Sequence, residues 1–244
     1  MSDVVVVIPA RFASTRFPGK PLASRTGRPL IQHVCQRAAL AKCASRILVA
    51  TDDSRIERVV REFGGQVVMT RDDHPNGTSR LTEVARDLPA GTIVVNVQGD
   101  EPDIDPALID KAVDALGDAD MCTIASPFAA DEDPNDPNIV KVVVDRSGRA
   151  LYFSRSLIPY KRDAMGPCQP LKHVGLYVYR REFLIDYVGM MPTPLERTEQ
   201  LEQLRVLEYG RRIQVVIAET KHHGIDTPEQ YDEFVRRWSA ENQA

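Results

Sequence analysis

Short apolar runs alternate with helix-length amphipathic segments through the first half of the chain. The first run, VVVVI at residues 4–8, has no polar position, which is typical of a strand buried on both faces of a parallel sheet. Similar strand-like runs occupy residues 46–51, 66–70, 92–97 and 121–127. Segments with helical spacing or helix caps lie between them, at residues 29–41, 54–63, 77–88 and 106–116. This alternation predicts an α/β fold with a doubly wound, mostly parallel sheet.

The pattern changes after residue 127. Strand candidates at residues 139–145, 150–154 and 172–179 follow one another without long helices between them. They predict a mixed or antiparallel extension, either a lobe that closes over a ligand or a dimer interface. A helix at 201–209, a strand at 213–218 and a helix opened by Thr227-Pro228 complete the chain. We expect one domain over residues 1–244, with halves at about 1–127 and 128–244.

Composition and charge narrow the class of protein. A net charge of −4 over 244 residues gives no general attraction to nucleic acid or to anionic membranes. No apolar run reaches the length of about 18 residues that a bilayer requires. The start lacks a cationic segment followed by an apolar one, so we expect no signal peptide. The four cysteines form no C-x-x-C pair, which favours a cytoplasmic protein with reduced thiols.

The loop after the first strand carries candidate chemistry. It holds three cations, Arg11, Arg16 and Lys20, with the hydroxyl of Ser14 among them. Loops at the carboxyl ends of such strands bind ligands, and this one suits a polyanion such as a phosphate chain. The Walker pattern is not met, since its first glycine is absent and Pro21 replaces its hydroxyl residue. A basic surface loop without a ligand remains the alternative.

An acidic loop is expected beside this basic one. Residues 98–101 (QGDE) end the strand at 92–97, and the switch point of a doubly wound sheet lies between its first and fourth strands. Cations for phosphates together with Asp100 for a divalent metal favour a metal-dependent nucleoside triphosphate site. Asp226 is a candidate second carboxylate. Its spacing before Thr227-Pro228 alone favours a helix cap instead.

Two polar groupings in the second half have both a structural and a functional interpretation. Alternation along 172–179 places His173, Gly175, Tyr177 and Tyr179 on one strand face, either as a polar rim or as a wall for a polyhydroxylated ligand. Residues Glu199, Glu202 and Gln203 have the spacing of neighbours on one helix, where a solvated acidic face is the simpler interpretation.

Nearly the whole chain resembles one family. The opening VVIPARFASTRFPGKPL at residues 6–22 closely resembles the signature of 3-deoxy-manno-octulosonate (Kdo) cytidylyltransferases, also called CMP-Kdo synthetases. Further matching blocks follow in the same order: VATDD (49–53), VVMTRDDHPNGTSRL (67–81), VNVQGDEP (95–102), VKVVVD (140–145), LYFSRSLIPY (151–160), KHVGLYVYR (172–180), LEQLRVLEYG (201–210) and GIDTPEQ (224–230).

The resemblance implies an enzyme that converts CTP and Kdo to CMP-Kdo and pyrophosphate with Mg2+, for bacterial lipopolysaccharide or capsule. It implies a homodimer, with CTP bound by the first half and the sugar and dimer contacts made by the second. Catalytic roles fall to Arg11, Lys20, Asp100 and Asp226, and the last two would hold the metal. Nucleotide contacts are expected from Ala10, Arg11, Ser14, Arg16, Lys20, Thr70, Arg71, Gly77, Thr78, Arg80, Gln98 and Asp100.

The resemblance also implies which residues contact the sugar acid. These are Gln98, Arg155, His173, Tyr177, Glu202 and Gln203. The fork of Arg155 suits the two oxygens of the sugar carboxylate. Two rival hypotheses remain: a CMP-sugar synthetase for another acid, such as 8-amino-Kdo or a sialic-type sugar, and a non-catalytic nucleotide-binding regulator.

Overall fold

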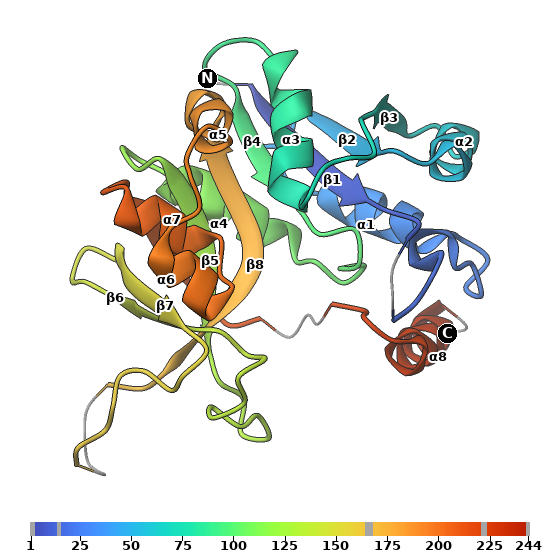
Figure 1. Cartoon of the computed structure of the whole chain (residues 1–244). Helices are drawn as coiled ribbons and strands as arrows, with labels where there is room; N and C mark the ends of the chain where they lie inside the picture. Colours follow the sequence, from blue (N-terminus) through green and yellow to red (C-terminus); the bar gives the residue numbers. More distant parts are fainter. Residues whose placement is uncertain (1–2, 14–15, 164–167, 221–223, 243–244) are drawn as a thin grey trace.

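The computed structural model describes residues 3–13, 16–163, 168–220 and 224–242, built around one mixed sheet (Figure 1). Its strands are β1 (Val4–Ala10), β2 (Arg46–Thr51), β3 (Gln66–Met69), β4 (Ile93–Asn96), β5 (Met121–Pro127), β6 (Lys141–Val144), β7 (Ala150–Ser154), β8 (Leu171–Arg180) and β9 (Ile213–Ile217). The main order is β3-β2-β1-β4-β8-β5-β9, and β6 joins β7 to β8.

The sheet confirms the predicted fold class. Strands β1 to β4 are mutually parallel, and β1 lies directly between β2 and β4, which is the expected switch point. Strand β8 runs antiparallel to both β4 and β5, whereas β5 and β9 are parallel. The β6–β7 hairpin pairs antiparallel with β8. It forms the antiparallel extension expected in the second half.

Helices cover both faces of the sheet. They are η1 (Lys20–Leu22), α1 (Leu30–Ala38), α2 (Ser54–Glu62), α3 (Gly77–Arg86), α4 (Pro106–Ala115), α5 (Arg181–Tyr187), α6 (Pro194–Glu199), α7 (Gln203–Glu208) and α8 (Pro228–Asn242). On β1, Val4, Val6 and Ile8 share a core with α1, α2 and α4. The alternate positions Val5 and Val7 share a core with α3, α5 and α7. The uninterrupted valine run is therefore buried on both faces, as predicted.

Helix starts follow the local capping chemistry. The Asp53 carboxylate accepts from the backbone N–H of Arg55 at 2.9 Å and caps α2, as the sequence predicts. Asp105 likewise accepts from Ala107 N–H at 3.0 Å at the start of α4. In the described ranges no helix has both the length and the apolar character needed to cross a bilayer.

The expected helix over residues 201–209 is wrong in its bounds. Gln200 adopts a left-handed conformation (φ 54°, ψ 49°) that ends α6, and α7 begins at Gln203. Glu199 therefore lies on α6 and Glu202 at the start of α7, so these two and Gln203 do not share one helix face. Helices α5 and α6 were not predicted, although Thr193 and Glu196 form a capping box before α6 that is visible in the sequence.

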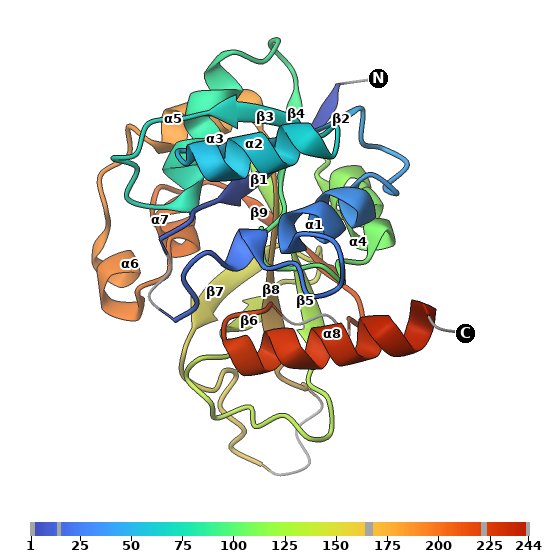
Figure 2. The same cartoon turned by 90° about the vertical axis from the view of Figure 1, so that its right-hand side faces the viewer.

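Helix α8 packs beside α1 and η1, on the side away from α2 (Figure 2). Its aromatic face contacts His33 of α1, whose ring lies 4.4 Å from that of Trp238, centroid to centroid. His33 is 2% exposed, and its Nε2 lies 2.7 Å from the hydroxyl of Thr26. Burial, assisted by nearby Arg28, lowers the pKa of His33 from 6.5 to about 4, so this histidine is neutral at pH 7.

The pKa of His33 predicts an acid-sensitive fold. The unfolded chain protonates this histidine below about pH 6.5, whereas the folded chain resists protonation until about pH 4. The free energy of unfolding should therefore fall as the pH drops across this interval, by about 3 kcal/mol for His33. Urea titrations at pH 7, 5.5 and 4 would measure the loss, and His33→Phe should make it smaller. An equal loss in His33→Phe and the parent would contradict this role.

Candidate active site

The first of two adjoining pockets lies where β1 and β4 end. This β1–β4 pocket has a volume of about 290 Å³. Six of the predicted nucleotide-binding residues line it: Ala10, Arg11, Lys20, Gly77, Gln98 and Asp100. The basic and acidic loops thus share one crevice, as the sheet order required. Predicted Ser14 lies outside the described residues.

A glycine allows the two strand ends to approach closely. A Cβ atom on Gly99 would lie 2.8 Å from the backbone oxygen of Pro9, closer than such atoms approach in proteins. The adjacent Asp100 and Gln98 both line the β1–β4 pocket. Gly99 therefore sets how near the acidic loop comes to the end of β1.

The fit at Gly99 predicts the effect of adding one methyl group. In Gly99→Ala, the Cβ must push the acidic loop away from Pro9 and move Asp100 out of position. We expect turnover to fall by about 10²-fold, measured by steady-state kinetics with CTP as varied substrate. Gly91 has open space at its Cβ position but a left-handed backbone (φ 78°), so Gly91→Ala controls for a glycine substitution that lowers stability away from the pocket. Parent-like turnover in Gly99→Ala would show that the close approach is dispensable.

Lys20 joins the two candidate metal ligands. Its ammonium donates to Asp100 Oδ2 at 2.7 Å and to the carbonyl oxygen of Ile225 at 2.6 Å, and it lies 3.6 Å from Asp226 Oδ1. The Lys20 side chain is only 11% exposed, so these contacts are poorly screened by water. Arg16, at the mouth of this cluster, lies 3.1 Å from Asp226 Oδ2. Two carboxylates and two cations therefore meet beside the β1–β4 pocket.

Asp226 is not the cap of α8. The backbone N–H of Gln230 donates to the Thr227 hydroxyl at 3.3 Å, and the N–H of Thr227 donates to Gln230 Oε1 at 3.0 Å. This reciprocal pair is a capping box with Thr227 at the cap position. The Asp226 carboxylate is thus available to Lys20 and Arg16, contrary to the interpretation that spacing alone favoured.

The donor chemistry of this cluster fits Mg2+. Asp100 and Asp226 offer hard carboxylate oxygens, and both side chains are partly exposed. Within the described ranges, no group of three or more His, Cys, Asp or Glu residues has metal-binding geometry. An ion that takes one or two carboxylates and completes its shell with phosphate oxygens and water matches such a site.

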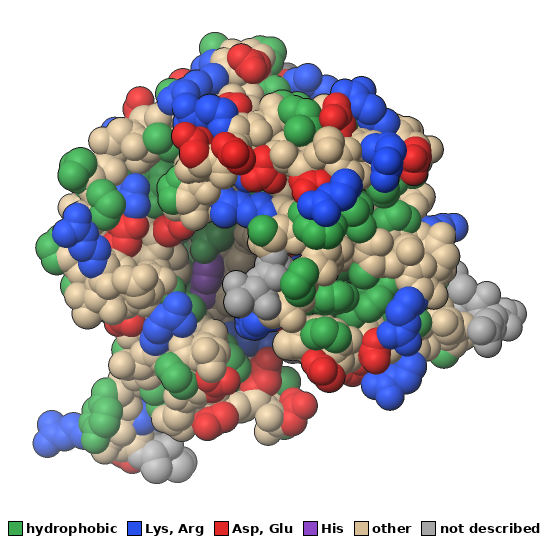
Figure 3. Space-filling model, turned by 45° about the vertical axis from the view of Figure 1, so that its right-hand side comes forward, with side chains coloured by type: hydrophobic (Ala, Val, Ile, Leu, Met, Phe, Trp, Pro, Cys, Tyr) green, Lys and Arg blue, Asp and Glu red, His purple; other side chains and the backbone are tan. Residues whose placement is uncertain are grey.

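The second pocket adjoins the first and shares Gly77 and Gln98 with it. This β8–α7 pocket has a volume of about 390 Å³ and lies between β8 and the start of α7. Its wall includes five of the six residues predicted to meet the sugar: Gln98, His173, Tyr177, Glu202 and Gln203. Thr78, predicted for the nucleotide, also lies here, and its hydroxyl donates to Glu202 Oε2 at 2.9 Å. Figure 3 shows the hollowed face, with histidine colouring visible inside it.

Side chains of the β8–α7 pocket are held neutral by burial. Desolvation lowers the pKa of His173 to about 4, and the ring Nε2 lies 2.9 Å from the Thr123 hydroxyl. Burial raises the pKa of Tyr177 and Tyr179 far above the usual range. Neutral rings and hydroxyls beside the carboxylate of Glu202 are suited to the hydroxyl groups of a sugar.

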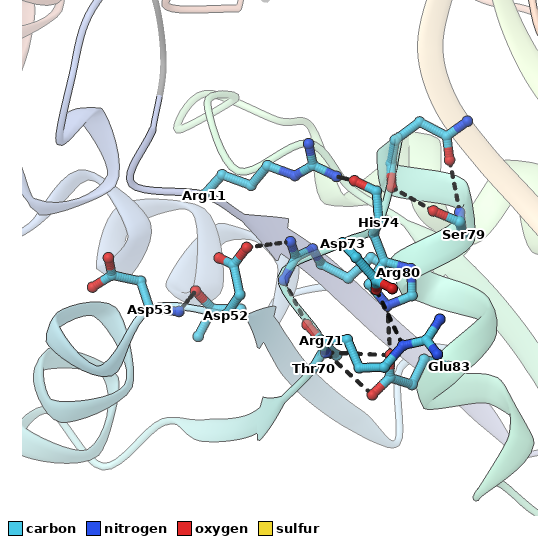
Figure 4. A network of polar contacts seen from close by, with 12 residues as sticks. Arg11, Asp52, Asp53, Thr70, Arg71, Asp73, His74, Ser79, Arg80 and Glu83 are labelled. Carbon is cyan, nitrogen blue, oxygen red and sulfur yellow. Dashed lines mark hydrogen bonds and ion pairs between the residues drawn. The ribbon is translucent and has the colours of Figure 1, made fainter.

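Thr70, Arg71 and Arg80, which were predicted to contact the nucleotide, lie outside both pockets. Arg80 is fully buried, donating from Nη1 to Thr70 Oγ1 at 2.5 Å and from Nη2 to Asp52 Oδ2 at 2.8 Å. The backbone N–H of Arg71 faces Glu83, and its exposed guanidinium lies 3.2 Å from Asp73. Figure 4 shows these side chains in one network that ties β2, β3 and α3 together. In this conformation Arg80 links α3 to the residues that directly follow β2 and β3.

The same network reaches the β1–β4 pocket through Arg11. The guanidinium of Arg11 donates to the carbonyl oxygen of His74 at 2.5 Å, and the His74 ring pairs with Glu83 (Figure 4). Asn76, which the sequence interpretation missed, caps α3 by accepting from Ser79 N–H at 2.9 Å and lines the β1–β4 pocket. The sequence signal that could have identified Asn76 is its residue type, since asparagine is favoured at the N-cap position before a helix start such as Gly77.

Arg155 does not line the β8–α7 pocket. Its guanidinium donates to the backbone oxygens of Glu199 at 2.8 Å and Pro137 at 3.0 Å, and lies 3.4 Å from that of Gln200. In the described structure, Arg155 thus braces the left-handed turn at Gln200 that leads to Glu202. Its predicted contact with a sugar carboxylate requires a different side-chain conformation.

Asn96 is a further pocket residue that the sequence interpretation missed. It lies on β4 opposite Tyr177 and is 3% exposed. Its Oδ1 is buried and accepts no hydrogen bond within the described part of the chain. A buried amide oxygen without a protein partner at a pocket wall suits a ligand hydroxyl or water. Its position inside an apolar strand run was the only sequence signal.

The fold and the two adjoining pockets define a nucleotidyltransferase-type site, and comparison with known proteins identifies the class. Residues 5–213 match the profile of the cytidylyltransferase family. A 3-deoxy-manno-octulosonate cytidylyltransferase of Geobacter metallireducens is 51% identical, covering 97% of this chain and 98% of the relative. One of Solibacter usitatus is 49% identical, covering 97% and 95%. The chain belongs to the 3-deoxy-manno-octulosonate cytidylyltransferase family.

Solved structures agree with this assignment. A CMP:2-keto-3-deoxy-manno-octonic acid synthetase complexed with CTP superposes with a TM-score of 0.93 at 42% identity, covering 98% of this chain and all 100% of that one. A 4-diphosphocytidyl-2C-methyl-D-erythritol synthase from Anaerococcus prevotii is 13% identical with a TM-score of 0.61, covering 100% of this chain and 97% of the other. This second likeness concerns the fold alone.

Proposed function

We propose that this protein is a CTP-dependent 3-deoxy-manno-octulosonate cytidylyltransferase, which forms CMP-Kdo and pyrophosphate. The observation that carries the proposal is the pair of adjoining pockets, one lined by cations and one by sugar-compatible groups, joined at Gly77 and Gln98. The anomeric hydroxyl oxygen of the sugar bonds to the α-phosphorus of CTP. The bond from that phosphorus to the pyrophosphate oxygen breaks, and the hydroxyl proton is released.

The protein contributes position and charge to this transfer. Lys20 and Arg11 face the β1–β4 pocket and are suited to the oxygens of the triphosphate. Gln98 lies at the junction and donates from Nε2 to Gly175 O at 3.3 Å, which orients its amide. Holding both substrates across one junction replaces a random encounter with an oriented one.

We assign Asp100 and Asp226 as the residues that hold Mg2+. Their convergence on Lys20 supports the assignment, because a place where two carboxylates surround positive charge can also hold a divalent cation. When bound, Mg2+ supplies positive charge at the phosphate oxygens where negative charge develops. Arg16, whose guanidinium lies 3.1 Å from Asp226, is placed to offset part of the negative charge of this carboxylate.

The sugar acid is assigned to the β8–α7 pocket. Glu202 accepts hydrogen bonds from ligand hydroxyls, and Tyr177 and His173 supply neutral polar groups. Asn96 Oδ1 provides one further acceptor at the wall. These groups suit several polyhydroxylated acids, so the choice of Kdo rests on the family assignment.

A substrate panel tests the proposed reaction. Pyrophosphate release would be measured with CTP, UTP or ATP against Kdo, 8-amino-Kdo or a sialic acid, with and without EDTA. We expect release only with CTP, strongest with Kdo and abolished by EDTA. Release with a sialic acid but not with Kdo would change the substrate assignment. No CTP-dependent release with any acid would favour a non-catalytic nucleotide-binding regulator.

We further propose a homodimer formed through the second half of the chain. Exposed apolar side chains gather around the end of α7: Met191, Leu195 and Tyr209. The Tyr209 hydroxyl accepts from Met191 N–H at 3.0 Å, and Leu195 N–H donates to Glu208, so these positions are neighbours. Light scattering after gel filtration should give twice the chain mass, and Leu195→Arg should give one chain mass. A monomeric parent would refute this assembly.

We place the reaction in the cytoplasm, ahead of lipopolysaccharide or capsule assembly. The four cysteines are unpaired, at Cys35, Cys43, Cys122 and Cys168, as suits a reducing compartment. An activated sugar must be consumed by a glycosyl transfer that releases CMP.

A further inference from the structure

The C-terminal helix packs against the loop that carries the catalytic lysine. The face of α8 forms a small apolar cluster of its own, in which Leu30, Ile225, Tyr231 and Phe234 are all buried. The rings of Phe17 and Tyr231 lie 5.7 Å apart, centroid to centroid. This cluster is separate from the two large cores on the faces of the sheet.

One polar contact and two ion pairs fasten α8 to the same region. The backbone N–H of Arg25 donates to the Tyr231 hydroxyl at 2.8 Å, and the Arg25 guanidinium pairs with Asp232. Further along the helix, Arg237 pairs with Asp103 at 2.6 Å. The helix therefore contacts both the segment after the basic loop and the segment after the acidic loop.

Two short connections lead from this cluster to the reacting groups. Phe17 packs on Tyr231, and its carbonyl oxygen accepts from the N–H of Lys20 at 3.2 Å. Ile225 is buried in the cluster, its N–H donates to Asp100 O at 2.9 Å, and its own carbonyl oxygen accepts from Lys20 Nζ. Asp226, the next residue, is anchored by its N–H to Gln230 of α8 at 2.6 Å.

We propose that α8 is the positioning element of the metal and phosphate site, with Tyr231 and Phe234 as positioning residues. They touch no reacting atom. Their packing fixes the positions of residues 224–227 and of the loop at Lys20. The carboxylates of Asp100 and Asp226 are thereby held close to the Lys20 ammonium. The catalytic part of this inference rests on the proposed function. The contacts that connect α8 to Lys20, Asp100 and Asp226 do not depend on it.

A consequence is that α8 docking and metal–nucleotide binding are thermodynamically linked. Ligands that require Asp226 and Lys20 in register favour the docked helix, and the docked helix favours those ligands by the same factor. The only tryptophan of the chain, Trp238, lies on α8 against His33 and reports on this docking. Its fluorescence therefore gives a measurement that needs no turnover.

Two conservative variants test the proposal. Tyr231→Phe removes only the hydroxyl that accepts from Arg25, and Phe234→Leu shrinks the buried contact while leaving Trp238 in place. We expect the Mg2+ concentration for half-maximal pyrophosphate release to rise about tenfold in Phe234→Leu and less in Tyr231→Phe. The KM for the sugar acid should stay near the parent value. In the parent, Mg2+ with CTP should change Trp238 emission, and Phe234→Leu should need correspondingly more ligand.

The control is a core substitution away from this cluster. Leu88→Ala truncates a buried side chain just after α3 in a different core and should lower the melting temperature without changing the Mg2+ requirement. The proposal is overturned if Phe234→Leu keeps the parental Mg2+ requirement, or if Leu88→Ala raises it equally. If the parent shows no turnover with any sugar acid, the proposed function fails. The shift of the Trp238 response in Phe234→Leu then decides the positioning role alone.

Discussion

Asp100→Ala is expected to lower kcat by about 10³-fold or more while the protein remains folded. The Asp100 side chain is 28% exposed and pairs with the Lys20 ammonium, so its loss removes a proposed metal ligand and leaves the core intact. Lys20 keeps the Ile225 carbonyl and the nearby Asp226 carboxylate, which limits the loss of stability. Pyrophosphate release at saturating CTP and sugar, titrated with Mg2+, measures the effect.

The matched control is Asp114→Ala. It removes an exposed carboxylate from α4 and changes the net charge equally. We expect Asp114→Ala to retain parental kcat and Mg2+ dependence, whereas Asp100→Ala should require more Mg2+ for its residual activity. Equal turnover in Asp100→Ala and the parent would remove Asp100 from the catalytic set. A large fall in melting temperature would instead indicate a structural role.

The fold was largely predictable because its main signals are local. The valine run of β1 and the cap at Asp53 depend only on consecutive residues, and both predictions were confirmed. Parallel pairing then brings the ends of β1 and β4 together without further information. The break at Gln200 was not predictable in this way. Its left-handed backbone has no glycine to mark it and is held by tertiary contacts, including those with Arg155.

The residues of the candidate site also differ in how far local sequence signals predict them. Residues of the loops that follow β1 and β4, such as Lys20 and Asp100, fall where the topology predicts, because both loops leave the same edge of the sheet. The role of Arg80 could not be predicted in this way. An arginine near the start of a helix can contact a ligand or can be buried in contacts within the protein, and the sequence does not distinguish the two. For Asp226, only the hydrogen bonds of Thr227 show that another residue caps α8 and that the Asp226 carboxylate is not used for capping. Asn96 was hidden because a buried polar group in an apolar strand carries no spacing signal.

Lys20→Met should also reduce activity strongly, but with the opposite effect on the metal requirement. The substitution removes the ammonium between Asp100 and Asp226 and leaves two carboxylates without their shared cation. The uncompensated negative charge disfavours the triphosphate and favours a divalent cation. We expect kcat/KM for CTP to fall by about 10²- to 10³-fold. The Mg2+ concentration for half-maximal activity should stay equal or decrease.

The contrast between the two variants is the decisive measurement. Asp100→Ala raises the Mg2+ requirement because a ligand is lost, whereas Lys20→Met does not, because both ligands remain. Lys111→Met, on the exposed surface of α4, controls for the loss of one positive charge and should leave the kinetics unchanged. A CTP titration at several fixed Mg2+ concentrations separates the effect on CTP binding from the effect on the Mg2+ requirement. If Lys20→Met raises the Mg2+ requirement as Asp100→Ala does, the lysine acts by holding the carboxylates in place more than by binding phosphate.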